Sequence, residues 1–315
     1  MCIRDSKNTM ESSKRFNIYR IIKEGLFIHE EQIIKSLKIT PDVPSTKGVH
    51  WTLSGIEERE LQSDSNETLN IIFGELIQYR EKDQFERLDR KVKQIKSYFV
   101  DDNIITRRMF LYIPKYSGII LEQVPSRDEV ASRNYLVKLI NKGLQLLLIP
   151  GNCTIETISD LRKISAKIKE LNEITFIQAS ITPSNPIYNP IWHKLDESLR
   201  SRNAERLTIS ERARMSSNEG LKTKIKECLD EGENLNYSSD RSYSILDAGF
   251  MMALDGYGQA TIKGRALGSA KIKTIKTADT QEHFESDANA SRGKLAKISI
   301  SKFNKLAKER KWRKN

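Results

Sequence analysis

The sequence contains few cysteines and no long apolar run. Its three cysteines, Cys2, Cys153 and Cys228, are far apart and form no CxxC pair. Such a sparse, odd set argues against a disulfide framework and against a cysteine-ligated zinc site, and it is typical of a reducing compartment. No apolar run approaches the roughly 18 residues that span a bilayer, and the leucine-rich segment 144–149, for example, has only six. Because the N-terminus also lacks the apolar core of a signal peptide, we expect a cytoplasmic protein without a membrane partner.

Sequence motifs of common enzyme classes are also missing. The glycine-containing segments 256–258 and 264–268 lack the third glycine of a dinucleotide loop and the Gly-Lys-Ser/Thr ending of a P-loop. His29 precedes two glutamates, but no second histidine follows at the spacing of a zinc-protease helix. We therefore expect no small-molecule cofactor and no metal site, and we assign no catalytic residue.

Positive charge is concentrated in two segments. The chain has 53 Lys and Arg against 42 Asp and Glu, which gives a net charge of +11. Residues 292–315 carry ten Lys and Arg and one acid, and residues 256–278 contain several cations and no acid at all. Charge that is clustered in this way predicts a polyanionic partner.

Hydrophobic periodicity predicts an α+β fold. Period-two alternation in residues 16–22 and 69–79 indicates strands, and residues 104–113 and 118–124 indicate an antiparallel hairpin around a Pro-containing turn. The charged segment 57–67 is predicted to be a loop. The charged segment 80–96 is predicted to be either a solvated helix or a loop. After Pro125, segments with helical periodicity alternate with segments that are predicted to be strands. The first helix would be capped by Ser126 and would end at Gly143.

The fold prediction is therefore a strand-rich N-terminal half with an antiparallel hairpin, followed by a βα-alternating C-terminal half that ends in a basic hairpin and a basic tail. We divide the chain into residues 1–9, an artefact or a disordered start; residues 10–125, an antiparallel strand-rich region; residues 126–280, an α+β region packed against it; and residues 281–315, the basic tail. The first six residues, MCIRDS, resemble translated adapter sequence.

Residues 259–263 and 269–274 predict the basic hairpin, with a glycine-rich turn between them. Alternate residues of a strand share a face, so Lys271 and Lys273 would point the same way and Lys263 would join them across the ladder. Tyr257 precedes the hairpin and would stack on a base or pack inside the protein. The alternative interpretation is that these lysines only protect an edge strand from aggregation.

The basic tail has two interpretations. Leu295, Phe303 and Leu306 would anchor a short helix from Ser301 on the protein with its cations outward. The alternative is a disordered basic extension. Trp312 lies near the end of the chain and is, with Tyr257, a candidate to stack on a base.

We predict a non-enzymatic nucleic-acid-binding protein of low sequence specificity. The predicted phosphate-binding and stacking residues are Tyr257, Lys263, Arg265, Lys271, Lys273, Lys276, Arg310, Lys311 and Arg313. One alternative is a metal-dependent nuclease with His50 or the pair Asp101 and Asp102 near its substrate. A second alternative is an interaction subunit that binds an acidic protein. Dimerisation of the chain is left open.

Several segments also carry a family resemblance. They are residues 69–75 (LNIIFGE), 108–114 (RMFLYIP), 118–121 (GIIL), 174–190 (ITFIQASITPSNPIYNP), 204–209 (AERLTI) and 253–264 (ALDGYGQATIKG). Over most of its length the chain resembles a bacterial family of unknown function, number four-seven-four-seven. Its layout is also similar to the phage-exclusion sensors of lambdoid phages, which are dimers that bind DNA. These resemblances imply DNA binding in a phage-defence or mobile-element system, by analogy of fold, and they carry over no catalytic residue.

Overall fold

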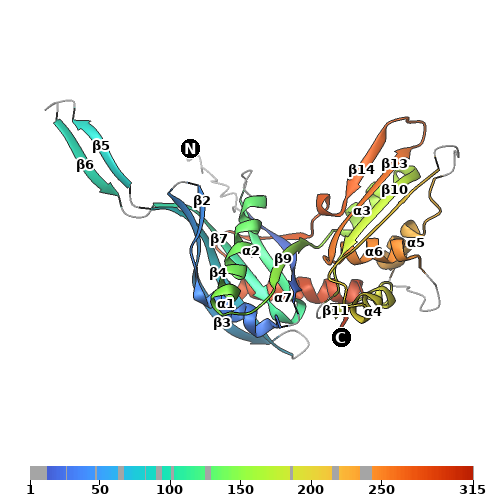
Figure 1. Ribbon diagram of the computed structural model, residues 1–315, viewed down its shortest axis with the longest axis horizontal. Coiled ribbons are helices and arrows are strands. Elements are labelled where there is room, and N and C mark those ends of the chain that lie inside the picture. Colours follow the sequence, from blue (N-terminus) through green and yellow to red (C-terminus); the bar gives the residue numbers. More distant parts are fainter. Residues whose placement is uncertain are drawn as a thin grey trace, which may run out of the picture.

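The computed structural model contains two main antiparallel sheets, of eight and four strands, which lie side by side with their own helices (Figure 1). It describes residues 13–25, 27–46, 48–62, 67–81, 83–89, 94–100, 103–124, 129–184, 187–214, 220–234 and 243–314. The α+β prediction is confirmed, with a strand-rich N-terminal half.

The large sheet has the strand order β15-β1-β8-β7-β4-β3-β2, and β9 also pairs with β1. The strands are β1 (Ser13–Glu24), β2 (Val43–Thr46), β3 (Val49–Gln62), β4 (Thr68–Arg80), β7 (Asn103–Ile113), β8 (Gly118–Gln123), β9 (Asn152–Thr157) and β15 (His283–Asp287). One edge of β1 pairs with β8, whereas the other edge pairs first with β15 and then with β9. A segment near the C-terminus therefore completes the sheet that the first strand begins.

Helices cover both faces of the large sheet. Helices α1 (Glu30–Ile39) and α2 (Glu129–Leu146) pack on the face to which β1 contributes Tyr19 and Ile21. Helix α7 (Arg292–Glu309) packs on the opposite face, where β1 contributes Phe16 and Ile18. Successive strand residues point to opposite faces, so two covered faces explain why β1 is buried at every position from Phe16 to Ile22, with Asn17 and Arg20 included.

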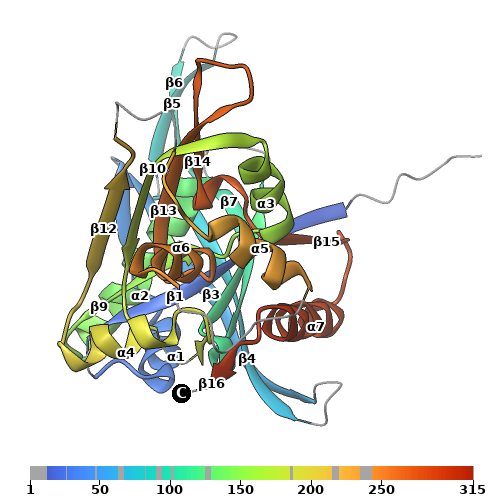
Figure 2. The same ribbon diagram turned by 90° about the vertical axis from the view of Figure 1, so that its right-hand side faces the viewer.

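The small sheet has the strand order β12-β10-β13-β14 and is covered on one face. Its strands are β10 (Leu171–Ile181), β12 (Leu207–Arg212), β13 (Gly258–Ala266) and β14 (Ile272–Lys276). Helices α3 (Leu161–Lys169), α4 (His193–Ser201), α5 (Ile225–Asn234) and α6 (Ile245–Leu254) form one core with it (Figure 2). Ile177 and Ala179 of β10 are buried in this core, whereas Gln178 between them is exposed. The second face of the small sheet is therefore open, and we call it the open face.

A buried polar cluster joins the end of α7 to both sheets. Arg310 Nη1 donates a hydrogen bond to Asp255 Oδ1 at 3.0 Å, and Trp192 Nε1 donates to Asp255 Oδ2 at 2.9 Å. Arg20 of β1 donates from Nε to the Asp255 carbonyl at 2.7 Å, and its guanidinium lies 4.4 Å from the centroid of the Trp312 ring. Because a buried charge is stable only when it is paired, this cluster ties the C-terminal segment to the turn before β13.

The smaller elements include an antiparallel hairpin that projects from the large sheet (Figure 1). They are β5 (Asp83–Asp89), β6 (Gln94–Val100), β11 (Ile187–Tyr188), β16 (Arg313–Lys314), η1 (Pro114–Tyr116) and η2 (Thr277–Asp279). The prediction of a helix or loop over residues 80–96 is wrong, because β4 and β7 are already antiparallel neighbours and the chain continues between them as the β5–β6 hairpin. The loop predicted from residue 57 is also wrong in its first part, since β3 continues to Gln62.

Gly143 does not end its helix, because α2 continues to Leu146. A Cβ atom at Gly143 would lie 2.5 Å from the backbone oxygen of Ser36, so the glycine lets α2 approach α1 closely. The close packing of the two helices, rather than a turn, is therefore the reason for a glycine at position 143. The cap predicted at Ser126 lies outside the described residues.

The C-terminal segment is an integral part of the fold rather than a tail. Ser291 caps α7, and its side chain accepts a hydrogen bond from the backbone N–H of Lys294. Leu295, Phe303 and Leu306 are buried against the large sheet, as expected for a docked helix. The helix begins at Arg292, well before the predicted start at Ser301, and the disordered alternative is wrong because the apolar stripe of α7 covers a sheet face.

Candidate nucleic-acid interface

Strand register assembles the open face from four strands. Phe176 of β10 lies opposite Arg212 of β12 on one side and opposite Lys263 of β13 on the other. Directly opposed residues of antiparallel strands point to the same face, so these three side chains form one row. Thr274 continues this row on β14, and the next row consists of Ser210, Gln178, Thr261 and Lys276.

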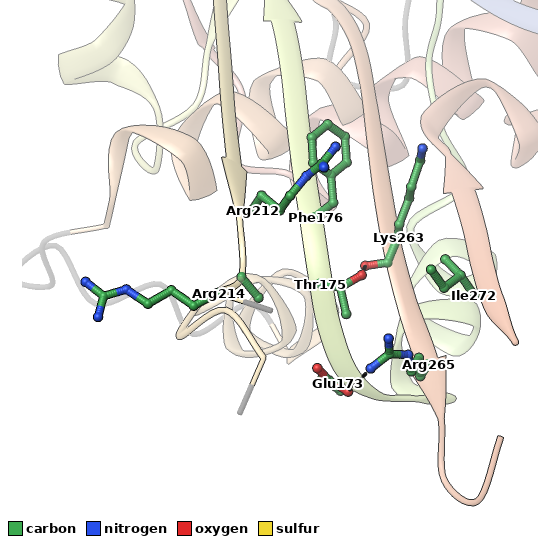
Figure 3. A pocket seen from close by; sticks show the side chains of 9 residues that line it. Glu173, Thr175, Phe176, Arg212, Arg214, Lys263, Arg265 and Ile272 are labelled. Carbon is green, nitrogen blue, oxygen red and sulfur yellow. Dashed lines mark hydrogen bonds and ion pairs between the residues drawn. The ribbon is translucent and has the colours of Figure 1, made fainter. Parts of the chain in front are cut away.

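Phe176 lines a shallow hollow on the open face, together with Arg212 and Lys263 (Figure 3). The hollow has a volume of about 290 Å³, which is at the lower end for small-molecule sites. The Arg212 guanidinium lies 5.6 Å and the Lys263 ammonium 5.4 Å from the centroid of the Phe176 ring. Both distances are within the range of cation–π attraction, so the two cations gather around one aromatic ring.

The charge of this face is mostly uncompensated. Glu173 is the acid that borders the hollow, and its Oε2 lies 3.4 Å from Nη1 of Arg265. Neither Arg212 nor Lys263 has a carboxylate partner among the described residues. The row beside Phe176 therefore presents two positive charges that are free to bind an anion.

The hairpin divides its predicted cations between two faces. Lys263, Arg265 and Lys276 lie on the open face, whereas Lys273 lies opposite Gly264 and points to the helix side. There its Nζ is 2.8 Å from Oε2 of Glu170. The prediction that Lys263 and Lys273 share a face is wrong, because Lys263 is paired with Thr274 and the neighbouring residue Lys273 points the other way. Lys271 is exposed in the bend before β14.

Tyr257 does not lie on the candidate interface. It is 1% exposed, and its hydroxyl donates a hydrogen bond to the backbone oxygen of Ile187 at 2.7 Å. Burial raises the pKa of Tyr257 to about 12. The prediction that it stacks on a base is wrong, whereas the alternative that it packs inside the protein is confirmed.

The cations predicted at the C-terminus have different surroundings. Arg310 is buried against Asp255, so its prediction as a phosphate-binding residue is wrong. Lys311 and Trp312 are half-buried, and the guanidinium groups of Arg20 and Arg310 lie 4.4 and 5.7 Å from the centroid of the Trp312 ring. Arg313, on β16, is exposed.

Acids, most of them from outside α7, pair with several cations of the C-terminal segment. Arg292 Nη1 lies 2.8 Å from Oε2 of Glu57, and Lys302 Nζ lies 2.9 Å from Oε2 of Glu282. Further pairs are Lys294 with Asp287, Lys305 with Glu309 and Arg310 with Asp255. The segment that appears most basic in the sequence therefore contributes less free charge than its composition indicates.

The residues of the nuclease alternative do not form a recognisable site within the described residues. His50 Nε2 lies 3.0 Å from Oε1 of Glu81, and the His50 ring is 5.7 Å from the ring of Tyr79. Asp101 and Asp102 lie outside the described residues. No group of three or more His, Cys, Asp or Glu among the residues that the structure describes is placed to hold a metal ion.

Two residues of the interface, Phe176 and Arg212, were missed by reasoning from the sequence. A signal for Phe176 is present, because two large apolar residues, Phe176 and Ile177, are adjacent in one strand. Neighbouring strand residues point to opposite faces, so only one of the two can enter a one-sided core. For Arg212 there is no such local signal, since only the register of β12 on β10 brings it to the ring.

Comparison with known protein families identifies the family of this chain. The family model described as "Domain of unknown function (DUF4747)" matches residues 31–308. The chain belongs to this family. The resemblance inferred from the sequence is thereby confirmed, and the similarity in layout to phage-exclusion sensors stays a prediction. No curated protein matches the DUF4747 chain. Within the described part of this family member, no helix is both long and apolar enough to cross a membrane.

Proposed function

We propose that this protein binds nucleic acid through the open face of the small sheet, without catalysing a reaction. The observation that carries the proposal is the row of Arg212, Phe176 and Lys263, in which two cations flank an accessible aromatic ring and have no described carboxylate partner. Nucleic acids offer regularly spaced phosphates for the cations and aromatic bases for the ring.

Low sequence specificity follows from the same residues. Lys and Arg contacts to phosphates fix the position of a nucleic acid and carry no sequence information, and stacking tolerates every base. The uncharged polar groups in and beside the row are Thr274, Ser210, Gln178 and Thr261. Of these only Gln178 is of a type that pairs bidentately with a base edge, and a single such group reads at most one position. We further propose that the protein acts in the bacterial cytoplasm, in the phage-defence or mobile-element system that the family resemblance implies.

The test compares two charge reversals on the same hairpin. Lys263→Glu changes a free cation of the open face, whereas Lys273→Glu changes a cation that points to the helix side and pairs with Glu170. Both variants change the net charge of the protein by the same amount, so the long-range attraction between protein and nucleic acid is the same in both. Fluorescence anisotropy with labelled single- and double-stranded DNA and RNA over a salt series gives the affinity and the salt dependence.

We expect Lys263→Glu to weaken binding and to reduce the log–log salt slope by about 0.7 to 0.9, the value of one phosphate contact. Lys273→Glu should retain the wild-type slope. Equal losses in both variants would contradict the open face as the site. Absence of binding to every oligonucleotide would overturn the proposal and favour an acidic protein partner. Sedimentation of the bound and free protein tests the predicted alternative of a homodimer.

A further inference from the structure

The geometry points to a single-stranded nucleic acid as the ligand of the open face, with one base stacked on Phe176 and the flanking phosphates on Arg212 and Lys263. This inference rests on the proposed nucleic-acid binding and adds the strandedness and the role of one ring. It comes from the position of Phe176, the spacing of the two cations and the width of the sheet.

Phe176 makes no large contribution to a core. Its neighbours Ile177 and Ala179 are fully buried against the helices of the small sheet, whereas the Phe176 ring faces the hollow and is only half-buried. A phenyl ring gains little stability at such a position, because the apolar area that it removes from water is small. The ring is instead placed where a planar partner can lie on it.

The two cations are spaced to hold a chain that runs across the strands. Arg212 and Lys263 lie on either side of β10, and the strand spacing of about 4.8 Å puts their backbones about 10 Å apart. Both side chains are exposed, and in the free protein they lie over the ring. A base that stacks on Phe176 would displace them toward the phosphates on either side of that base.

A duplex does not fit this arrangement. The faces of paired bases are covered by the neighbouring pairs, so a ring reaches them in a duplex only if it projects as a wedge between base steps. The Phe176 ring is half-buried in a hollow and does not project in this way, so it can stack on a base of an unpaired strand. The sheet is also too wide for a groove: four strands measure about 14 Å between the outer backbones, and the major groove of DNA is about 12 Å wide. A duplex could contact only the cations of the open face, through its phosphates.

The experiment measures the affinity of the full chain for three probes of equal length. They are a single strand, the same single strand with abasic sites in place of its bases, and a duplex. Phe176→Ala should weaken binding to the base-bearing single strand by roughly 5- to 100-fold, which is the effect of losing one stacked base. Its affinity for the abasic strand and for the duplex should not change. Phe27→Ala, a matched control at a phenylalanine that is 63% exposed elsewhere, should bind as the wild type.

A second variant reports on stacking directly. Phe176→Trp should bind the single strand at least as tightly as the wild type, and its indole fluorescence should be quenched on binding to the base-bearing strand and not to the abasic strand. Equal affinity of wild type and Phe176→Ala for the base-bearing strand would overturn the inference. If Lys263→Glu still weakened binding in that case, the proposed function would stand without it. If no probe bound the wild-type protein, both the inference and the proposed function would be overturned.

Discussion

Helix α7 and the open face of the small sheet are both basic in sequence, but their cations have opposite surroundings. Five cations of the C-terminal segment, Arg292, Lys294, Lys302, Lys305 and Arg310, lie beside carboxylates, most of them from distant parts of the chain. On the open face, Lys263 and Arg212 contact the Phe176 ring and no described acid. The density of charge along a sequence therefore does not predict which cations can bind a partner.

The two regions also differ in how their apolar residues are used. α7 covers one face of the large sheet with a stripe of buried side chains, so its cations occupy the remaining, solvent-exposed side of an essential helix. The small sheet buries one face only, and its second face presents a polar surface with one aromatic ring. A structural helix and a candidate binding surface can thus share the same basic composition.

The largest expected effect tests whether α7 is structural. A chain that ends after Ala290 would expose the face of the large sheet that Leu295, Ile300 and Phe303 cover. Burial of each such side chain contributes about 1.5 to 3 kcal/mol, and a whole domain is stable by only about 5 to 15 kcal/mol. We expect the shortened chain to lose its cooperative urea unfolding, measured by circular dichroism.

The matched control for this truncation removes charge without removing the helix. Lys297 and Lys308 are exposed on α7, so the double variant Lys297→Gln and Lys308→Gln should keep the wild-type unfolding midpoint. A truncated chain with a wild-type midpoint would show that α7 is dispensable, and it would remove the contrast between the two regions.

A smaller effect separates the phenylalanines of the two regions. Phe303 is fully buried and stacks on Tyr116 with 5.2 Å between the ring centroids, so Phe303→Ala should lower the free energy of unfolding by about 3 to 5 kcal/mol. Phe176→Ala removes only two surface cation–π contacts and should lower it by about 1 kcal/mol. Urea denaturation of both variants gives the comparison. Equal losses would mean that Phe176 is a core residue, and its role as a stacking platform would lose support.

The smallest expected effect concerns the pH dependence of stability at the edge of the open face. Burial raises the pKa of Glu156, although its hydrogen bond from Gln259 and the nearby Arg133 and Arg206 oppose the shift. A carboxyl group with a raised pKa in the folded state favours folding when it is protonated. The contribution of Glu156 is therefore most favourable below its unfolded pKa, and it declines as the pH rises through the folded pKa.

Glu156→Gln removes this ionisation and keeps the shape of the side chain. We expect the variant to gain stability relative to the wild type as the pH rises from about 4 to about 7, in urea unfolding experiments at a series of pH values. A constant difference in stability between the two proteins across this range would contradict the raised pKa.

Many elements could be predicted from local patterns. β1, β4 and the β7–β8 hairpin were correctly placed because apolar and polar residues alternate over part of their length and turn residues separate β7 from β8. The end of β3 was missed because its residues are polar: Glu57 and Glu58 pair with Arg292 and Lys38 rather than entering a core. The β5–β6 hairpin was missed because its high charge resembles that of a solvated helix.

The candidate site could be predicted only in part. Lys263, Arg265 and Lys276 belong to one acid-free segment and were identified from it. Tyr257 was expected to stack on a base, but it is buried. The aromatic ring on the open face is that of Phe176, which lies on β10 rather than beside the hairpin. The register between β10 and β13 brings Phe176 and Lys263 together, although they are far apart in the sequence.

The α+β class, the approximate positions of most strands and helices, and the family of the chain could be inferred without a structure. These properties depend on short-range periodicity and on recognisable segments. Which cations are free, which aromatic ring is exposed and the role of the basic C-terminus as a core helix became visible in the folded protein. The physical reason is that the neutralisation of a cation and the burial of a ring depend on partners such as Glu57 for Arg292 or Asp255 for Arg310, which only the pairing and packing of distant segments bring into contact.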